Sequence, residues 1–289
     1  MTRATQPLNL SDLKALEVSL PDATGGLGAG IVTVTLTGPG KGNAMGPAFW
    51  EELPLVFRTL DRDPATRVVI LRGKGEHFSY GLDLQAMAPR LAPLLGGDHP
   101  AKSRTELLDF VTELQDATNA VARCRKPVIA AVDGFCLGGG VDVIAACDVR
   151  LATTRATFGI REVRVAMVAD LGSLQRLPGI IGEGHARELA LTGRDIDAAR
   201  ALRIHLVNDL YETPEALYAA AHALAASIAE NPPLVVEGVK RVRNQETESR
   251  AQEGLDYVAV WNAAFLPSED LTEAFTAFAA RRRPTYRGS

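Results

Sequence analysis

The 289-residue chain has few of the residues on which metal sites, disulfide frameworks and membrane spans depend. It has three cysteines: Cys124, Cys136 and Cys147. Their spacing does not match the CxxC interval of metal sites, and their odd number does not fit a disulfide framework, so we predict reduced thiols. No apolar run reaches the ~18 residues of a membrane span, and residues 1–14 lack the apolar core of a signal peptide. These absences predict a cytoplasmic protein with no membrane association.

Several common catalytic and binding motifs are also missing. The glycine-rich segments do not follow GxGxxG or GxxxxGK[ST], LGSLQ is not GxSxG, and the five histidines form no HExxH. We therefore expect no dinucleotide fold, phosphate loop, serine hydrolase or metal site. A net charge of −4 gives no reason to expect a nucleic-acid surface.

Alternating strand and helix patterns fill the first two thirds of the chain. Residues 30–38 and 65–75 read as strands, and residues 46–63 between them read as a helix. Ser103 and Glu106 have capping-box spacing at the start of a long amphipathic run that ends at Arg125. Further strands are expected in the apolar segments PVIAAVDG, DVRLAT and HLVNDLY. This order predicts an α/β fold with a parallel sheet.

The pattern changes near residue 212. Thr213 followed by Pro214 is typical of a helix start, and no strand candidate follows as far as Arg283. We therefore divide the chain into a core that carries the active site, residues 1–212, and a C-terminal helical region, residues 213–289.

The stretch DGFCLGGGVDVIAACDVR, residues 133–150, raises the main functional question. Three glycines let a backbone approach a ligand closely, and a helix that begins at about Gly139 would point free N–H groups at it. Such an end favours negative charge, so it suits an oxyanion. The loop HFSYGLDL, residues 77–84, follows a strand and offers further backbone donors. Two such loops can hold one carbonyl oxygen that becomes negative in a transition state.

The segments FSYGLDL and KPVIAAVDGFCLGGGVDVIAACDVRLATTRATFGIREVRVAMVADLGSLQRLPGIIG resemble the crotonase (enoyl-CoA hydratase/isomerase) superfamily, as does NAMGPAFWEEL. The resemblance covers about residues 28–285. It implies a spiral (ββα)n core, a C-terminal trimerisation region that gives homotrimers or hexamers, and an acyl-CoA substrate with no other cofactor. By position, the backbone amides of Tyr80 and Gly139 would form the oxyanion hole. The same positions imply these substrate-binding residues: Gly81, Leu82, Asp83, Leu84 and Gly140.

Three acids follow the triple glycine at Asp142, Glu162 and Asp170. Their pattern is similar to that of the Δ3,5-Δ2,4-dienoyl-CoA isomerases, which move a 3,5-diene into conjugation with the thioester. That reaction removes a proton at C2 and delivers one at C6, which one short carboxylate cannot easily do. The resemblance implies three catalytic acids: Glu162 as the base at C2, Asp170 as the acid at C6 and Asp142 as an orienting or auxiliary group.

The sequence leaves two other functions open. An enoyl-CoA hydratase with Asp142 in place of the usual glutamate is one, and a non-catalytic acyl-CoA- or RNA-binding homologue is another. Three positions depart from the family pattern: Tyr80 is large for its place, Gln85 stands where a lysine often holds CoA, and Arg164 stands where dienoyl-CoA isomerases tend to have an acid. The CoA phosphates would then need other cations, with candidates at Lys41, Lys74 and residues 281–283.

Overall fold

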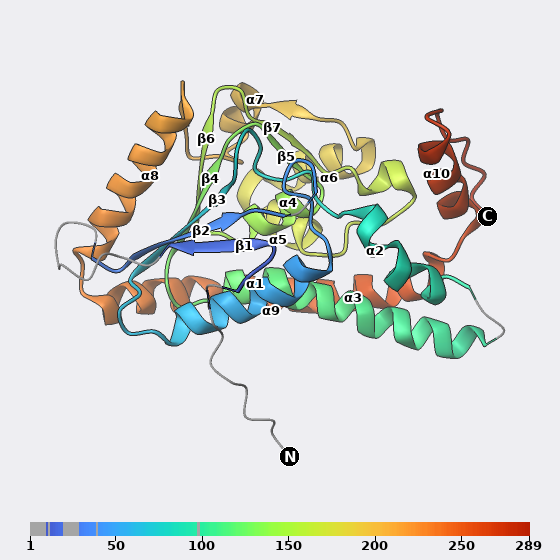
Figure 1. Ribbon diagram of the computed structural model, residues 1–289, viewed down its shortest axis with the longest axis horizontal. Helices are drawn as coiled ribbons and strands as arrows, with labels where there is room; N and C mark the ends of the chain where they lie inside the picture. Colours follow the sequence, from blue (N-terminus) through green and yellow to red (C-terminus); the bar gives the residue numbers. More distant parts are fainter. Residues whose placement is uncertain (1–9, 11, 20–28, 39, 97–98) are drawn as a thin grey trace, which may run out of the picture.

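A computed structural model describes residues 10, 12–19, 29–38, 40–96 and 99–289, and its core is a six-stranded sheet (Figure 1). The strand order is β1-β2-β3-β4-β6-β9, and only the edge strand β1 is antiparallel to its neighbour. The strands are β1 (Leu16–Ser19), β2 (Ile31–Leu36), β3 (Val68–Gly73), β4 (Val128–Val132), β6 (Val149–Thr153) and β9 (Asp209–Tyr211). The predicted parallel sheet is confirmed.

Helices cover both faces of this sheet, which explains why its inner strands are largely apolar, whereas the edge strands β1 and β9 carry exposed polar residues, Glu17 and Asp209. On one face lie α1 (Pro47–Arg62) and α3 (Pro100–Arg123), packed on each other and on the main core. On the other face α8 (Pro214–Ala229) buries Leu217 and Ala221 against Val68 and Ile70. The remaining short elements are α2 (Leu84–Leu91), η1 (Ala92–Leu94), α5 (Ser173–Ile181), α6 (Glu183–Thr192) and α7 (Ala198–Arg203).

A second, three-stranded sheet carries the glycine-rich segment. Its order is β5 (Phe135–Leu137), β7 (Thr157–Gly159) and β8 (Ile196–Asp197), with β5 parallel to β7. Helix α4 (Gly139–Ala145) leaves β5 through Gly138, so it begins at the predicted residue. The one-turn helix η2 (Glu162–Val165) follows β7 and brings the second acid toward α4.

The chain beyond Glu212 is helical. Thr213 caps α8 by accepting a hydrogen bond from the Ala216 N–H at 3.2 Å, as the Thr-Pro pair predicts. Helix α9 (Pro233–Phe265) runs beside α3 along the lower edge of Figure 1. Helix α10 (Glu269–Ala279) lies at the right of the figure, near the C-terminus. Because α8 packs on the sheet, it shares its core with the strands, and the division at residue 212 stays a prediction.

Two local predictions are wrong. The helix expected from Ser103 begins at Pro100, so Ser103 lies inside the first turn and its N–H donates to the His99 carbonyl. Proline at the first helical position moves this start toward the N-terminus. The strand expected over residues 205–211 forms only as β9, because His205 takes a left-handed backbone with φ of 66° at the end of α7.

No helix among the described residues is long and apolar enough to cross a membrane.

Candidate active site

The loop at residues 77–84 and the triple glycine lie side by side, joined by backbone hydrogen bonds. The Ser79 N–H donates to the Phe135 carbonyl, and the Leu137 N–H donates to the Ser79 carbonyl, both at 3.0 Å. Gly81 has φ of +82°, and a side chain there would meet the Leu137 carbonyl at 2.6 Å and the Gly139 nitrogen at 3.1 Å. Glycine is therefore required for the two loops to approach this closely.

The first turn of α4 provides the free backbone donor. Gly138 has φ of +51°, and its N–H donates to the Gly159 carbonyl. The Gly139 N–H donates to no acceptor among the described residues. Gly140 packs against Cys136 and Ser79, where a side chain would have both in contact at 3.4 Å. An unpaired N–H at a helix start favours a negative oxygen.

The Tyr80 amide, the second predicted donor, already has a partner. Its N–H donates to the Gly42 carbonyl at 2.9 Å, and its ring lies so close to Gly42 that a side chain there would meet the ring at 2.7 Å. The ring also packs against His77 and Phe135, with centroids 5.0 and 5.7 Å away. Holding a substrate oxygen at Tyr80 therefore requires this N–H to be shared with Gly42 or released, and its role stays a prediction.

The loop that carries Asn43 and Met45 also supports the site, a role that the sequence did not predict. Asn43 has φ of 52°, and its Nδ2 donates to the Lys74 and His77 carbonyls at 2.9 and 2.8 Å. The Met45 N–H donates to the Gly81 carbonyl at 2.8 Å. An asparagine beside glycine in GKGN was the available signal, since both residues tolerate a left-handed backbone.

Asp142 lies on α4 with 1% of its surface exposed. Its Oδ1 accepts a hydrogen bond from the Ser173 N–H, the first amide of α5, at 2.6 Å. Burial raises the pKa of Asp142 to about 6, although the Ser173 hydrogen bond opposes that rise. The carboxyl group is thus held between the starts of two helices.

Glu162 points at the triple glycine. Its Oε1 lies 3.1 Å from the place where a Gly138 side chain would begin, and its Oε2 is buried without a hydrogen-bond partner among the described residues. Burial, and next the charge of Asp142, raise the pKa of Glu162 to about 8. A surface ion pair with Arg161 is not formed, because Arg161 binds Asp195.

Asp170 precedes α5 and faces the C-terminal region. Its Oδ2 accepts a hydrogen bond from Asn262 of α9 at 2.6 Å. Burial raises the pKa of Asp170 to about 7, while the Asn262 hydrogen bond opposes that rise and the charge of Asp142 adds to it. Asp170 does not cap α5, whose N-cap is Gly172.

The three acids are close enough to affect one another's ionisation, and Glu162 lies directly against the glycine turn. Carboxyl groups whose pKa values lie near neutrality can accept or donate protons at working pH. The free Gly139 N–H lies on the same short helix as Asp142 and follows Gly138, against which Glu162 lies. The arrangement can therefore hold a negative oxygen and transfer protons near it.

The other predicted residues fall into two groups. Leu82 pairs with Met45, Asp83 caps α2 by accepting from the Ala86 N–H at 2.9 Å, and Leu84 opens that helix, so these three hold the loop in place. The candidate cations lie at the surface: Lys41 and Lys74 are exposed, as are Arg281, Arg282 and Arg283, of which Lys74 pairs with Glu17 and Arg282 with Glu273.

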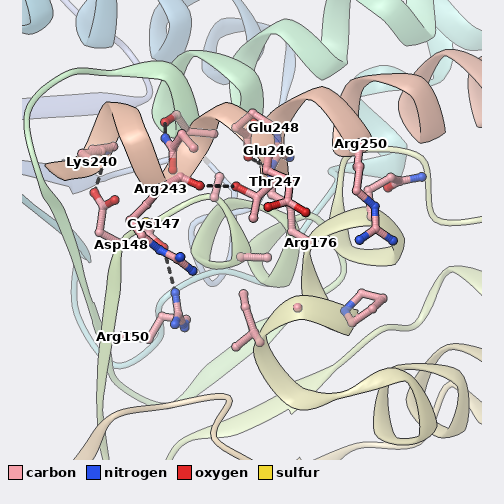
Figure 2. Close-up of a pocket in the computed structure, with 18 of the residues that line it drawn as sticks. Cys147, Asp148, Arg150, Arg176, Lys240, Arg243, Glu246, Thr247, Glu248 and Arg250 are labelled. Atoms are coloured by element: carbon pink, nitrogen blue, oxygen red, sulfur yellow. Dashed lines mark hydrogen bonds and ion pairs between the residues drawn. The ribbon is translucent and has the colours of Figure 1, made fainter. Parts of the chain in front are cut away.

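A cavity of about 1290 Å³ lies elsewhere, between α9, α5 and the end of α4, and none of the three acids lines it. Two ion pairs lie among the charged side chains that Figure 2 labels: Lys240 with Asp148, and Arg176 with Glu248. The cavity is open beside α9, where the side chains of Val235, Val239 and Tyr257 are exposed.

An α/β fold that sets one buried and two partly buried acids near a free helix N-terminus is typical of an acid–base enzyme acting on a carbonyl compound. The family model described as "Enoyl-CoA hydratase/isomerase" matches residues 26–289, so the chain belongs to this family. A solved enoyl-CoA hydratase/isomerase from Pseudoalteromonas atlantica T6c has a TM-score of 0.80 and 25% identity, covering 95% of this chain and 100% of that one. The expected crotonase fold with a helical C-terminal region is thereby confirmed.

Two curated relatives are similar over most of the chain. The Delta(3,5)-Delta(2,4)-dienoyl-CoA isomerase of Dictyostelium discoideum, named mitochondrial, is 39% identical over 99% of this chain and 96% of its own. The enzyme of the same name from Arabidopsis thaliana, named peroxisomal, is 41% identical over 86% of this chain and 89% of its own. These names point to organelles, so they contradict the predicted cytoplasmic location, which rested on missing sequence signals.

Proposed function

We propose that the protein converts 3,5-dienoyl-CoA to 2,4-dienoyl-CoA. The chain is an isomerase of the crotonase superfamily, and an acyl-CoA thioester fits the family as substrate. The observation that carries the proposal is the set of three acids, Asp142, Glu162 and Asp170, whose pKa values burial raises to about 6, 8 and 7 beside the glycine turn. Two of them can act as base and acid at separate carbons.

In the proposed mechanism Glu162 removes the proton at C2. The C2–H electron pair then becomes the enolate, whose oxygen the Gly139 N–H, and the Tyr80 N–H if Gly42 releases it, would stabilise. An unpartnered Oε2 suits this role, because no hydrogen bond from the described residues occupies that oxygen. The nearby charge of Asp142 also raises the basicity of Glu162.

Asp170 would complete the reaction at C6. The enolate electrons return through the diene, the double bonds move to the 2,4 positions, and C6 takes the proton of Asp170. Glu162 ends protonated and Asp170 ionised, so one proton must pass between them or through solvent before the next turnover. Because the substrate is neither oxidised nor reduced, we propose that the reaction needs no cofactor beyond the CoA of the substrate.

Purified protein with 3,5-octadienoyl-CoA should develop the absorbance of a conjugated 2,4-dienoyl thioester. Asp170→Asn removes the acid while keeping the size and the side-chain polarity, so it should lose at least about 100-fold in kcat, the usual contribution of a general acid. Recovery of unchanged substrate with wild-type protein would refute the proposal. Faster hydration of crotonyl-CoA than diene shift would instead favour a hydratase.

We also propose that the protein forms a homotrimer or hexamer through α9. This helix exposes several large apolar side chains, among them Val239, Val242, Tyr257 and Phe265, each more than half exposed. Exposed apolar groups that gather along one element are typical of association surfaces. Light scattering coupled to size exclusion should give a mass of three or six chains. A monomer would refute this assembly.

A further inference from the structure

Asn262 contacts the proposed acid from a distant part of the chain. It lies on α9 with 2% of its surface exposed, and its Nδ2 donates to Asp170 Oδ2 at 2.6 Å and to the Val168 carbonyl at 2.9 Å. A backbone carbonyl can only accept, so the contact with Val168 fixes which end of the amide faces Asp170. Asn262 is the one side chain among the described residues that donates to this carboxyl group.

A second buried amide fixes the backbone of the same residue. Gln115 of α3 has 1% of its surface exposed, and its Nε2 donates to the Asp170 carbonyl at 2.9 Å and to the Leu255 carbonyl at 3.0 Å. Asp170 is therefore held by its carboxyl group from α9 and by its backbone from α3. Neither amide can gain or lose a proton at working pH, so neither can replace the acid.

We propose that Asn262 is a positioning residue for proton delivery by Asp170, and that it acts by fixing Oδ2 so that the transferable proton resides on Oδ1. The inference rests on the proposed function of Asp170 as the acid at C6. An amide N–H cannot accept a hydrogen bond, so a protonated Oδ2 would face a donor, whereas a protonated Oδ1 leaves the 2.6 Å contact intact. The C-terminal helical region thereby takes part in the chemistry of the core.

This arrangement has a consequence for ionisation. The Asn262 hydrogen bond stabilises the charged carboxylate and so lowers the pKa of Asp170 against the effect of burial. Without that donor the desolvation of the carboxyl group is no longer opposed by the Asn262 hydrogen bond, so its pKa rises further. The acid would then remain protonated to higher pH while losing its fixed orientation.

The test compares Asn262→Leu with Asn244→Leu. Asn244 is a matched control, because it lies on the same helix and its Nδ2 also donates to a backbone carbonyl, that of Ala122 at 2.9 Å, away from the acids. We expect Asn262→Leu to lower kcat for the diene shift by roughly 10- to 100-fold with KM within about twofold, since misorientation of a general acid costs rate rather than binding. Asn244→Leu should keep wild-type kcat.

Two further measurements separate positioning from general damage. Exchange of the C2 hydrogen in deuterated water depends on Glu162, so it should continue in Asn262→Leu while the shift to C6 fails. The alkaline limb of the pH–rate profile should move to higher pH. Equal loss of C2 exchange and diene shift, or an unmoved alkaline limb, would overturn the inference.

The carboxyl band of Asp170 in the infrared, assigned with Asp170→Asn, gives a readout that needs no turnover. Its titration should move to higher pH in Asn262→Leu, and an unchanged titration would overturn the inference. Should Asn262→Leu fail to fold, Asn262→Ala removes the donor from Asp170 without adding apolar bulk and takes its place. Wild-type protein without diene shift would refute the proposed function, while the infrared titration would still test the contact.

Discussion

Replacing Glu162 by Gln should stabilise the fold at alkaline pH. The carboxyl group lies against Gly138, its Oε2 is buried without a partner among the described residues, and its pKa rises from the ordinary 4.5 to about 8, chiefly because of burial. Ionising such a group costs the folded protein free energy that the unfolded chain does not expend. Gln has nearly the same shape and never ionises.

The sign and size of the effect follow from the two pKa values. Between pH 4.5 and about 8 the folded protein retains a proton on Glu162 that the unfolded chain has lost, so the free energy of unfolding falls as the pH rises. Each pH unit in this window lowers the free energy of unfolding by about 1.4 kcal/mol, so the wild type loses about 5 kcal/mol over the whole window. Most of that, about 4 kcal/mol, arises between pH 5 and pH 8.5.

Urea unfolding at a fixed protein concentration and at several pH values between about 5 and 8.5 measures this difference. Glu51→Gln is the control, because Glu51 is an exposed residue of α1 and should leave the stability curve unchanged. Glu162→Gln should gain stability over the wild type as the pH rises while losing isomerase activity. A stability difference that stays constant with pH, or that favours Glu162 at alkaline pH, would refute the reasoning.

Three more outcomes are expected. The pH–rate profile should be bell-shaped with its maximum between about pH 7 and 8, because Glu162 must be ionised and Asp170 protonated. Steady-state rates measured across a range of pH values check the expectation, and a flat profile would contradict it. Gly138→Ala should cost about 1–3 kcal/mol in urea unfolding and lower activity, since φ is +51° and the new methyl would meet Glu162; a fully active variant would contradict the tight glycine turn. Thr213→Ala should lower stability by about 1 kcal/mol in the same assay with kcat unchanged, because it removes only the cap of α8.

Local sequence signals predicted the parts of the fold that local physics determines. The start of α4 at Gly139 and the cap at Thr213 follow from glycine and Thr-Pro chemistry that acts within a few residues. The capping box at Ser103 failed because Pro100 offered a competing start three residues earlier. Two valid local signals overlapped there, and spacing alone does not say which of them begins the helix.

The contacts around the site could not be predicted in this way. Asn262 and Asp170 are 92 positions apart, and Gln115 and Asp170 are 55 apart, so only the folded chain brings them together. The hydrogen bond from the Tyr80 N–H to the Gly42 carbonyl also joins separate loops. Family resemblance indicated which acids to examine, but it gave no information on the amides that hold them.

The Gly139 donor belongs to the peptide backbone, while the three acids of the site are side chains on three different segments. Among single substitutions only one to proline removes a main-chain N–H, so replacing any one acid leaves the Gly139 donor proposed to hold the thioester oxygen in place. An engineer seeking a new reaction can therefore exchange Asp142, Glu162 or Asp170 singly and screen the products, with the proposed oxyanion donor kept. In the proposed mechanism, reaction type and carbonyl activation thus depend on separate parts of the chain.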